Sequence, residues 1–158
     1  MASTSSPTPA AAGDTRLHQL QEWLSSLTAP AIAVPSIRPA SADASFRRYF
    51  RVDAAHDKAD NKNGNVSTAS TTTYIVMDAP PPQEDVRPFL HVAAVFGATG
   101  VSVPHVIAQD IERGFLLLSD LGSTTYLHQL NIDTAHKLYS DAIDALILRR
   151  SSLRRGRA

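Results

Sequence analysis

The fold of this chain is decided by the stretch ASADASFRRYFRV, which occupies residues 40–52. The pattern predicts a tight turn of small residues between two strands. Side chains alternate between the two faces of a strand, so Arg47 and Arg51 are expected on one face and Arg48 on the other. At least one guanidinium can then reach an anion held at the turn. On these residues alone, a solvated hairpin with surface arginines is the alternative.

Further elements around this hairpin complete an α+β pattern. A run of three prolines at residues 80–82 cannot continue a hydrogen-bonded ladder, so it ends the strand before it. The predicted strands are Ile37 to Ser41, Phe46 to Val52, Tyr74 to Asp78, Val103 to Gln109 and Gly114 to Leu118. The predicted helices run from Asp14 to Leu27, from about Asp85 to just before Gly100, from Ser123 or Thr124 to Leu130, and from Asp133 to Leu148. An antiparallel sheet of about five strands with helices is therefore expected.

The composition fits one soluble domain. A chain of 158 residues can bury a core, and 43% hydrophobic residues is an ordinary share. No run approaches the roughly 18 apolar residues of a membrane span. Because the chain has no cysteine, a cytoplasmic location is the default expectation. Without cysteine there is no disulfide framework, thiol nucleophile or thiolate metal site. The six histidines are scattered, so no metal site is predicted.

Three segments are predicted to lie outside the packed domain. Residues 1–13 read as a disordered leader, and the polar residues 55–72 as a mobile loop. The tail 149–158 holds five of the 15 basic residues; ten remain against 15 acidic ones, so the body is near −5 and the tail +5. A shifted reading frame explains this abrupt change best, and a natural basic tail is the alternative. The tail lacks the interleaved aromatic residues of a single-strand nucleic-acid binder.

Three stretches, in this order, resemble the nucleotide-binding lobe of the aminoglycoside phosphotransferase-like kinases. They are residues 40–52, YIVMDAPPP at 74–82 and GFLLLSDLG at 114–122. Within that family they are similar to the bacterial branch that phosphorylates N-acetylmuramate and N-acetylglucosamine at the anomeric hydroxyl. The resemblance runs from about Leu17 to Leu148. It implies a protein-kinase-like small lobe over 14–121 and the first helices of a large catalytic lobe over 122–148, with the rest of that lobe missing.

The resemblance places the phosphates of ATP at the turn formed by Asp43, Ala44 and Ser45. This turn corresponds to the Gly-rich loop, whose backbone N–H groups cover the phosphates, although it contains no glycine. Protein kinases also use a Lys on the third strand that pairs with a Glu. None of the three lysines of this chain lies on that strand. Arg48 is the first candidate for the phosphate-binding cation, and Arg87 is the second.

The resemblance also places the adenine ring at the segment that joins the two lobes. Ser119, Asp120 and Leu121 would offer backbone N–H and C=O groups there. Val76 and Leu118 would supply apolar walls.

The expected function is that of a truncated ATP-dependent sugar kinase of cell-wall sugar recycling, inactive alone. In the family, Mg²⁺ is held by the large lobe, and no His-x-Asp loop follows residue 122, so no catalytic residue or metal ligand is assigned. The expected partners are a nucleotide, an amino sugar and a missing second lobe. Neither nucleic acid nor a membrane is expected. One alternative is a nucleotide-binding module that works with a separately encoded lobe, and another is a non-enzymatic binding protein with a basic tail.

Overall fold

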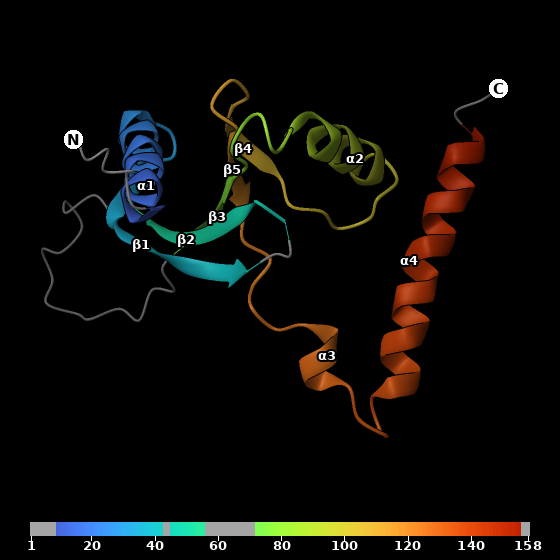
Figure 1. Cartoon of the computed structure of the whole chain (residues 1–158). Coiled ribbons are helices and arrows are strands. Elements are labelled where there is room, and N and C mark those ends of the chain that lie inside the picture. Colours follow the sequence, from blue (N-terminus) through green and yellow to red (C-terminus); the bar gives the residue numbers. More distant parts are fainter. Residues whose placement is uncertain (1–8, 43–44, 56–71, 156–158) are drawn as a thin grey trace, which may run out of the picture.

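The computed structural model describes residues 9–42, 45–55 and 72–155 of the chain. Figure 1 shows the order of the helices and strands within these residues. They are α1 (Pro9–Ser26), β1 (Ile32–Ala42), β2 (Arg48–Ala54), β3 (Thr73–Asp78), α2 (Arg87–Gly97), β4 (Val106–Asp110), β5 (Phe115–Ser119), α3 (Tyr126–Gln129) and α4 (Ala135–Arg155).

The strands form one antiparallel sheet in the order β1-β2-β3-β5-β4. This confirms the predicted α+β fold with a five-stranded sheet. Strand β1 begins at Ile32, earlier than the sequence predicted, and it contains Pro35 and Pro39. Because β1 lies at the edge of the sheet and its register shifts twice against β2, these prolines remove no central ladder bond.

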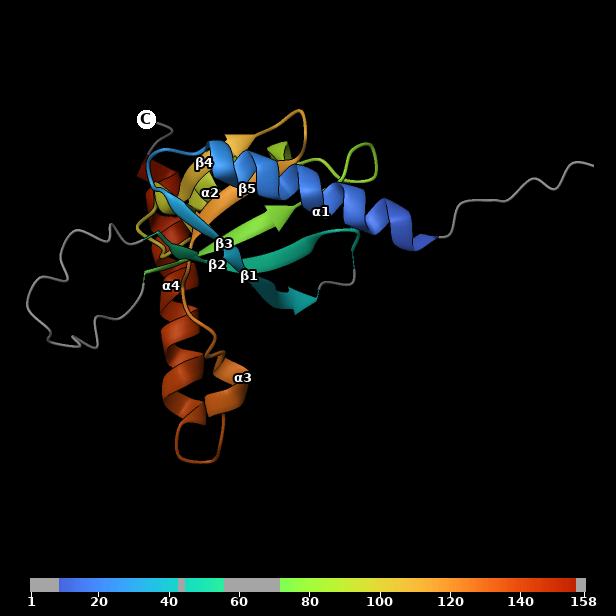
Figure 2. The same ribbon diagram turned by 90° about the vertical axis from the view of Figure 1, so that its left-hand side faces the viewer.

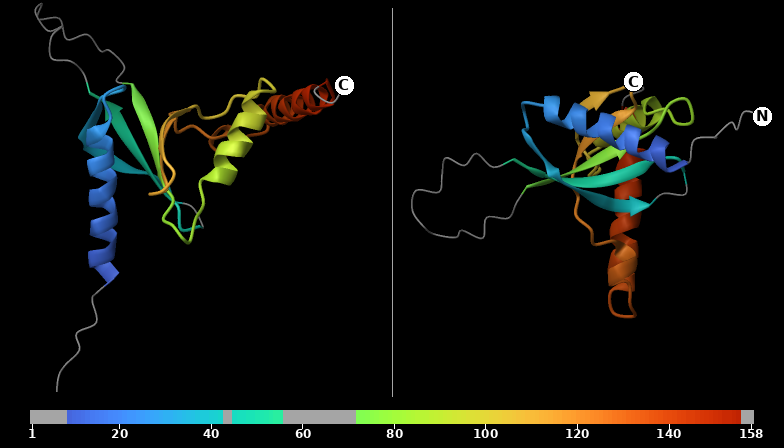
Figure 3. Two further views of the ribbon diagram at one scale, coloured as in Figure 1. Left: turned by 90° about the horizontal axis from the view of Figure 1, so that it is seen from above. Right: turned by 60° about the vertical axis from the view of Figure 1, so that its left-hand side comes forward.

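Helices α1 and α2 lie on opposite sides of the sheet (Figure 3, left). Helix α1 crosses one face (Figure 2) and buries Leu20, Trp23 and Leu24 against it. Strands β2, β3 and β5 complete this core with Val52, Val76, Phe115 and Leu117. The α1 face of the sheet is therefore closed by a tightly packed core.

The α2 face is less completely covered. Its buried cluster consists of Met77, Ala79, Val86, Leu116 and Leu118. Phe89 and Leu90 of α2 pack against this cluster, but no residue of α2 is itself buried, and Ala94 is exposed. This incomplete cover leaves space on the α2 face.

Two helices extend further than the sequence predicted. Helix α1 begins at Pro9 rather than Asp14, so part of the predicted leader is helical. Helix α4 continues to Arg155 rather than ending at Leu148. Alanine, leucine and arginine are good helix formers, and proline suits a first turn, so both extensions are locally favourable. The other predicted mobile residues, 1–8, 56–71 and 156–158, lie outside the described residues.

Helices α3 and α4 extend away from the sheet (Figure 1). On one face of α4, Ala135, Leu138 and Ala142 are half-buried. Large apolar side chains elsewhere in this region are exposed, namely Leu121, Tyr126, Leu127, Leu130, Ile132, Tyr139, Ile143 and Ile147.

The turn between β4 and β5 requires glycine at residue 114. Gly114 has φ +72°, and a Cβ built there would lie 1.9 Å from the carbonyl oxygen of Ala79. The Ala79 N–H donates to the Gly114 carbonyl at 2.9 Å, so the two backbones must approach closely.

We therefore expect Gly114→Ala to lower the free energy of unfolding by about 3 kcal/mol or more, because backbone strain and a steric clash add. Gly100→Ala is the matched control, since Gly100 also has a positive φ (81°) but open space around it. That variant should lose only about 1 kcal/mol. Urea denaturation of both variants tests this, and equal losses would contradict the role given to the Ala79 contact.

Candidate functional site

A cavity of about 450 Å³ opens on the α2 face where β5 ends. Its volume lies in the range of small-molecule sites, roughly 300–1,000 Å³. The sheet contributes Tyr49, Arg51, Ile75 and Leu118, while Phe89 comes from α2 and Leu121 from the segment after β5. Apolar walls thus meet a strand end that carries backbone polar groups.

A carboxylate just after β5 ties the edge of this cavity to the sheet. Asp120 accepts two hydrogen bonds from Arg51, at 2.6 and 3.2 Å, and one from the Thr73 hydroxyl at 2.7 Å. It also accepts the Gly122 N–H at 2.8 Å. The Arg51 hydrogen bond lowers the pKa of Asp120 to about 2, against an opposing effect of burial. The Asp120 carboxylate therefore stays charged and holds the chain after β5 against β2 and β3.

Some of the polar groups at the end of β5 already make hydrogen bonds within the protein. The Ser119 N–H donates to the His105 carbonyl at 2.9 Å, and the Ser119 hydroxyl accepts the His105 N–H at 2.8 Å. Within the described residues, the Leu121 N–H and C=O have no such partner. Asp120 makes its contacts with Arg51 and Thr73 through its side chain, so the backbone groups of both Asp120 and Leu121 can bind a ligand at this edge.

The cavity brings together four of the residues predicted from the sequence: Leu118, Ser119, Asp120 and Leu121. Val76 does not line it. That side chain is fully buried in the α1-facing core, and its neighbour Ile75 lies in the cavity wall instead. Pairing of Ile75 with Leu118 and Arg51 places all three on one face.

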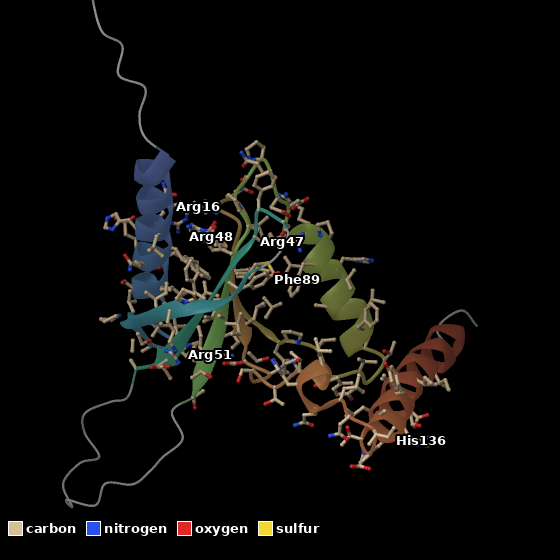
Figure 4. All side chains as sticks on the ribbon, turned by 60° about the horizontal axis from the view of Figure 1, so that its bottom comes forward. Arg16, Arg47, Arg48, Arg51, Phe89 and His136 are labelled. Atoms are coloured by element: carbon tan, nitrogen blue, oxygen red, sulfur yellow. The ribbon has the colours of Figure 1, made fainter. Side chains whose placement is uncertain are left out.

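Arg48 also points to the α1 face, as the strand alternation predicted. It binds the fully buried Asp78 through Nε, at 2.9 Å, and through Nη2. Arg16 of α1 binds the other oxygen of Asp78 at 2.8 Å and stacks on the Phe115 ring at 4.3 Å. Figure 4 shows Arg16 and Arg48 together beside α1. Arg48 is therefore paired with a buried carboxylate on the face opposite the cavity, although 39% of its side chain is exposed.

The remaining predicted phosphate contacts are less defined by the structure. Asp43 and Ala44 lie outside the described residues. The Ser45 hydroxyl accepts the Arg47 N–H at 3.2 Å. Arg87, the second candidate cation, is largely exposed and pairs with Asp85 and Glu112. It does not line the cavity.

The sequence did not predict the ion pair between Arg47 and Glu84. The Arg47 Nε donates to Glu84 at 2.9 Å, and the Phe46 N–H donates to the other carboxylate oxygen at 3.3 Å. Strand alternation predicts the face on which Arg47 lies, which is that of Arg51. It does not predict the contact with Glu84, which lies 37 positions away in the sequence. No local pattern reveals such a partner.

Among the described residues, no group of three or more His, Cys, Asp and Glu side chains could hold a metal ion. In the same part of the chain, no helix is both long and apolar enough to cross a membrane.

The order of the strands and the cavity at the end of β5 define the small lobe of a kinase-like phosphotransferase. The chain belongs to the phosphotransferase enzyme family, whose sequence profile matches residues 36–150. It is 45% identical over 143 residues to the N-acetylmuramate/N-acetylglucosamine kinase of Pseudomonas aeruginosa and 42% identical over 142 residues to that of Pseudomonas putida. The kinase of the same name from Neisseria meningitidis serogroup B is 37% identical over 121 residues.

These alignments cover 85% of this chain for both Pseudomonas proteins and 74% for the Neisseria protein. The chain spans 38% of the length of the two Pseudomonas kinases and 31% of the Neisseria kinase. The described cavity lies within the region that the family profile matches.

Removing the charge of Asp120 should lower stability at neutral pH. The lowered pKa of Asp120, about 2 against an ordinary 3.8, corresponds to about 2 kcal/mol at 1.36 kcal/mol per unit. Because the pKa is depressed in the folded state, this contribution is present above pH 4 and is lost as pH falls toward 2. The free energies of unfolding of the original chain and of Asp120→Asn, measured by urea denaturation, should therefore converge as the pH falls from about 4 toward 2. Asp133→Asn, at an exposed position, is the control and should leave stability unchanged.

The Asp78 cluster makes a second stability prediction. Arg16→Gln and Arg48→Gln each leave one arginine on the buried carboxylate, whereas the double variant leaves it without a cation. The double variant should thus lose about 3 kcal/mol or more, clearly above the sum of the two single losses. Chemical denaturation of the four proteins measures this, and simple additivity would contradict a shared role.

Proposed function

We propose that this chain forms the ATP-binding small lobe of a sugar kinase. The single observation that carries the proposal is the cavity at the end of β5, where apolar walls surround the unpaired backbone groups of Leu121. An adenine ring needs such walls for its faces and such groups for its polar edge. The names of the similar proteins, which are kinases, support the same assignment.

In this proposal, Ile75 and Leu118 form the wall on the sheet side of adenine, and Phe89 closes the α2 side. Leu121 supplies the backbone hydrogen bonds. The Asp120 backbone offers further hydrogen bonds, while its side chain fixes this edge to Arg51 and Ser119 fixes it to His105. The predicted turn at Asp43, Ala44 and Ser45 is assigned to the phosphates, by its resemblance to the family.

The proposed reaction of the longer protein is transfer of the terminal phosphoryl group of ATP to the anomeric hydroxyl of an amino sugar. The bond between that phosphorus and the bridging oxygen breaks and ADP leaves. The sugar oxygen forms the new bond to phosphorus, and its proton is released to solvent. N-acetylmuramate and N-acetylglucosamine are the proposed acceptors, from the names of the similar kinases. Such an activity belongs to cell-wall sugar recycling in the cytoplasm, where ATP is available.

Magnesium would shield the phosphates during transfer. No suitable ligand group lies within the described residues, and the 158 residues contain no His-x-Asp catalytic loop after residue 122. These residues alone are therefore proposed to bind ATP without transferring phosphate.

Calorimetry of the 158-residue chain with ATP tests the proposal, together with a variant that fills the cavity. Ala40 lies in the cavity wall on β1, so Ala40→Trp should weaken ATP binding at least tenfold by occupying the space for adenine. Ala33→Trp is the control, because Ala33 is a half-buried alanine of the same strand that does not line the cavity. No ATP binding by the original chain would overturn the proposal.

The same protein should release no sugar phosphate when incubated with ATP, Mg²⁺ and either amino sugar. Mass spectrometry of the sugars gives the measurement. Turnover that disappears in Ala40→Trp would overturn the statement that these residues bind without transferring.

A further inference from the structure

A nucleoside triphosphate in the cavity needs a fixed cation near its phosphates, and this inference rests on the proposed ATP site. A lysine on the third strand supplies that charge in protein kinases. Here, Met77 occupies the α2 face of β3 beside Ile75, and its side chain is fully buried. Lys137, the one lysine within the described residues, pairs with Asp141 on α4. Among the described residues, arginines are therefore the candidates for this charge.

The arginines of β2 differ in what already binds them. Arg48 lies on the opposite face and is held by Asp78. Arg51 faces the cavity, but Asp120 binds both its Nε and its Nη2. A guanidinium held at two nitrogens by one carboxylate is a poor site for a second anion, because its charge is already compensated.

Arg47 retains donors for an anion. Glu84 binds its Nε at 2.9 Å and Tyr49 also hydrogen-bonds it, which leaves about three of the five guanidinium N–H groups for an anion. Burial lowers the pKa of Arg47, but hydrogen bonds with Tyr49 and Glu84 outweigh it and raise that pKa above its usual value. The side chain is 26% exposed, so it is both charged and accessible.

The position of Arg47 matches a ligand that extends out of the cavity. Tyr49 lines the cavity and also contacts Arg47, so this tyrosine connects the two. Figure 4 shows Arg47 on the α2 side of the sheet, apart from Arg16 and Arg48. Glu84 also accepts the Phe46 N–H, which fixes the backbone that leads into β2.

We propose that Arg47 is the cation that binds the ATP phosphates and that Glu84 positions it. The pair takes the place of the lysine and glutamate of protein kinases, with the charge moved from the third strand to the residue just before the second. Glu84 orients the guanidinium through Nε, and the outward N–H groups contact phosphate oxygens. This adds a phosphate contact to the proposed function without changing the adenine site.

Adenosine and ATP distinguish a phosphate contact from an adenine contact. Both are titrated calorimetrically into the 158-residue chain and the double variant Arg47→Gln/Glu84→Gln, which removes the ion pair without leaving either charge alone. ATP affinity should fall about tenfold or more, the size of one lost charge-assisted hydrogen bond. Adenosine affinity should change less than about twofold.

Arg38→Gln/Asp53→Asn is the matched control. It removes another arginine–carboxylate pair of the same sheet, 2.8 Å apart, with the same change in net charge. Both ligands should bind this control as they bind the original chain. Glu84→Gln alone should lower the affinity for ATP but not for adenosine. The loss should be smaller than in the double variant, because Arg47 keeps its charge and loses only its orientation.

Four outcomes would overturn the inference. Equal losses for ATP and adenosine would mean that the pair only maintains the fold, and equal ATP losses in the control would mean a general charge effect. Unchanged ATP affinity in the double variant, with the original chain still binding both ligands, would refute the phosphate contact of Arg47. The proposed ATP site would then stand. An original chain that binds neither ligand would refute the proposed ATP site and this inference with it.

Discussion

The buried carboxylate of Asp78 is the constraint on which the rest of the structure depends. A fully buried charge is costly unless it is paired and hydrogen-bonded, and Asp78 is compensated from two directions. Arg16 brings α1 to it, and Arg48 fixes the pairing of β2 with β3 at the same point. Docking of the first helix and the register of the central hairpin are therefore coupled. Any ligand that needed Arg48 would have to leave Asp78 with one partner.

This coupling separates the two faces of the sheet. The α1 face carries the aromatic and aliphatic core, including the contact between Trp23 and Phe115 at 5.6 Å. The α2 face is only partly covered, since no residue of α2 is buried, and the cavity forms there. Asp120 then connects this open face to β2 through Arg51. The larger packed core and the cavity thus lie on opposite surfaces of the same three strands.

Alternation along β2 was readable from the sequence because polar and apolar residues interleave there, and it placed Arg48 and Arg51 on opposite faces. The same reasoning fails for β3. Ile75, Val76 and Met77 are all apolar because both faces of that strand are covered, so only its pairing with β5 decides which residue reaches the cavity. The partner of Glu84 was equally hidden, because a contact between distant segments leaves no periodic signal.

The arginine pairs of this sheet illustrate why the guanidinium suits a site that has no third-strand lysine. An ammonium is a single point charge, whereas a guanidinium presents donors in a fixed plane, so one edge can hold a carboxylate while another remains available. Arg51 binds Asp120 through two nitrogens, whereas Arg47 binds Glu84 through Nε alone. Of the arginines on the open face, one can therefore hold a structural carboxylate, as Arg51 does, while another keeps donors for a ligand, as proposed for Arg47. Met77 then serves the buried cluster on β3, where a lysine would be a desolvated charge.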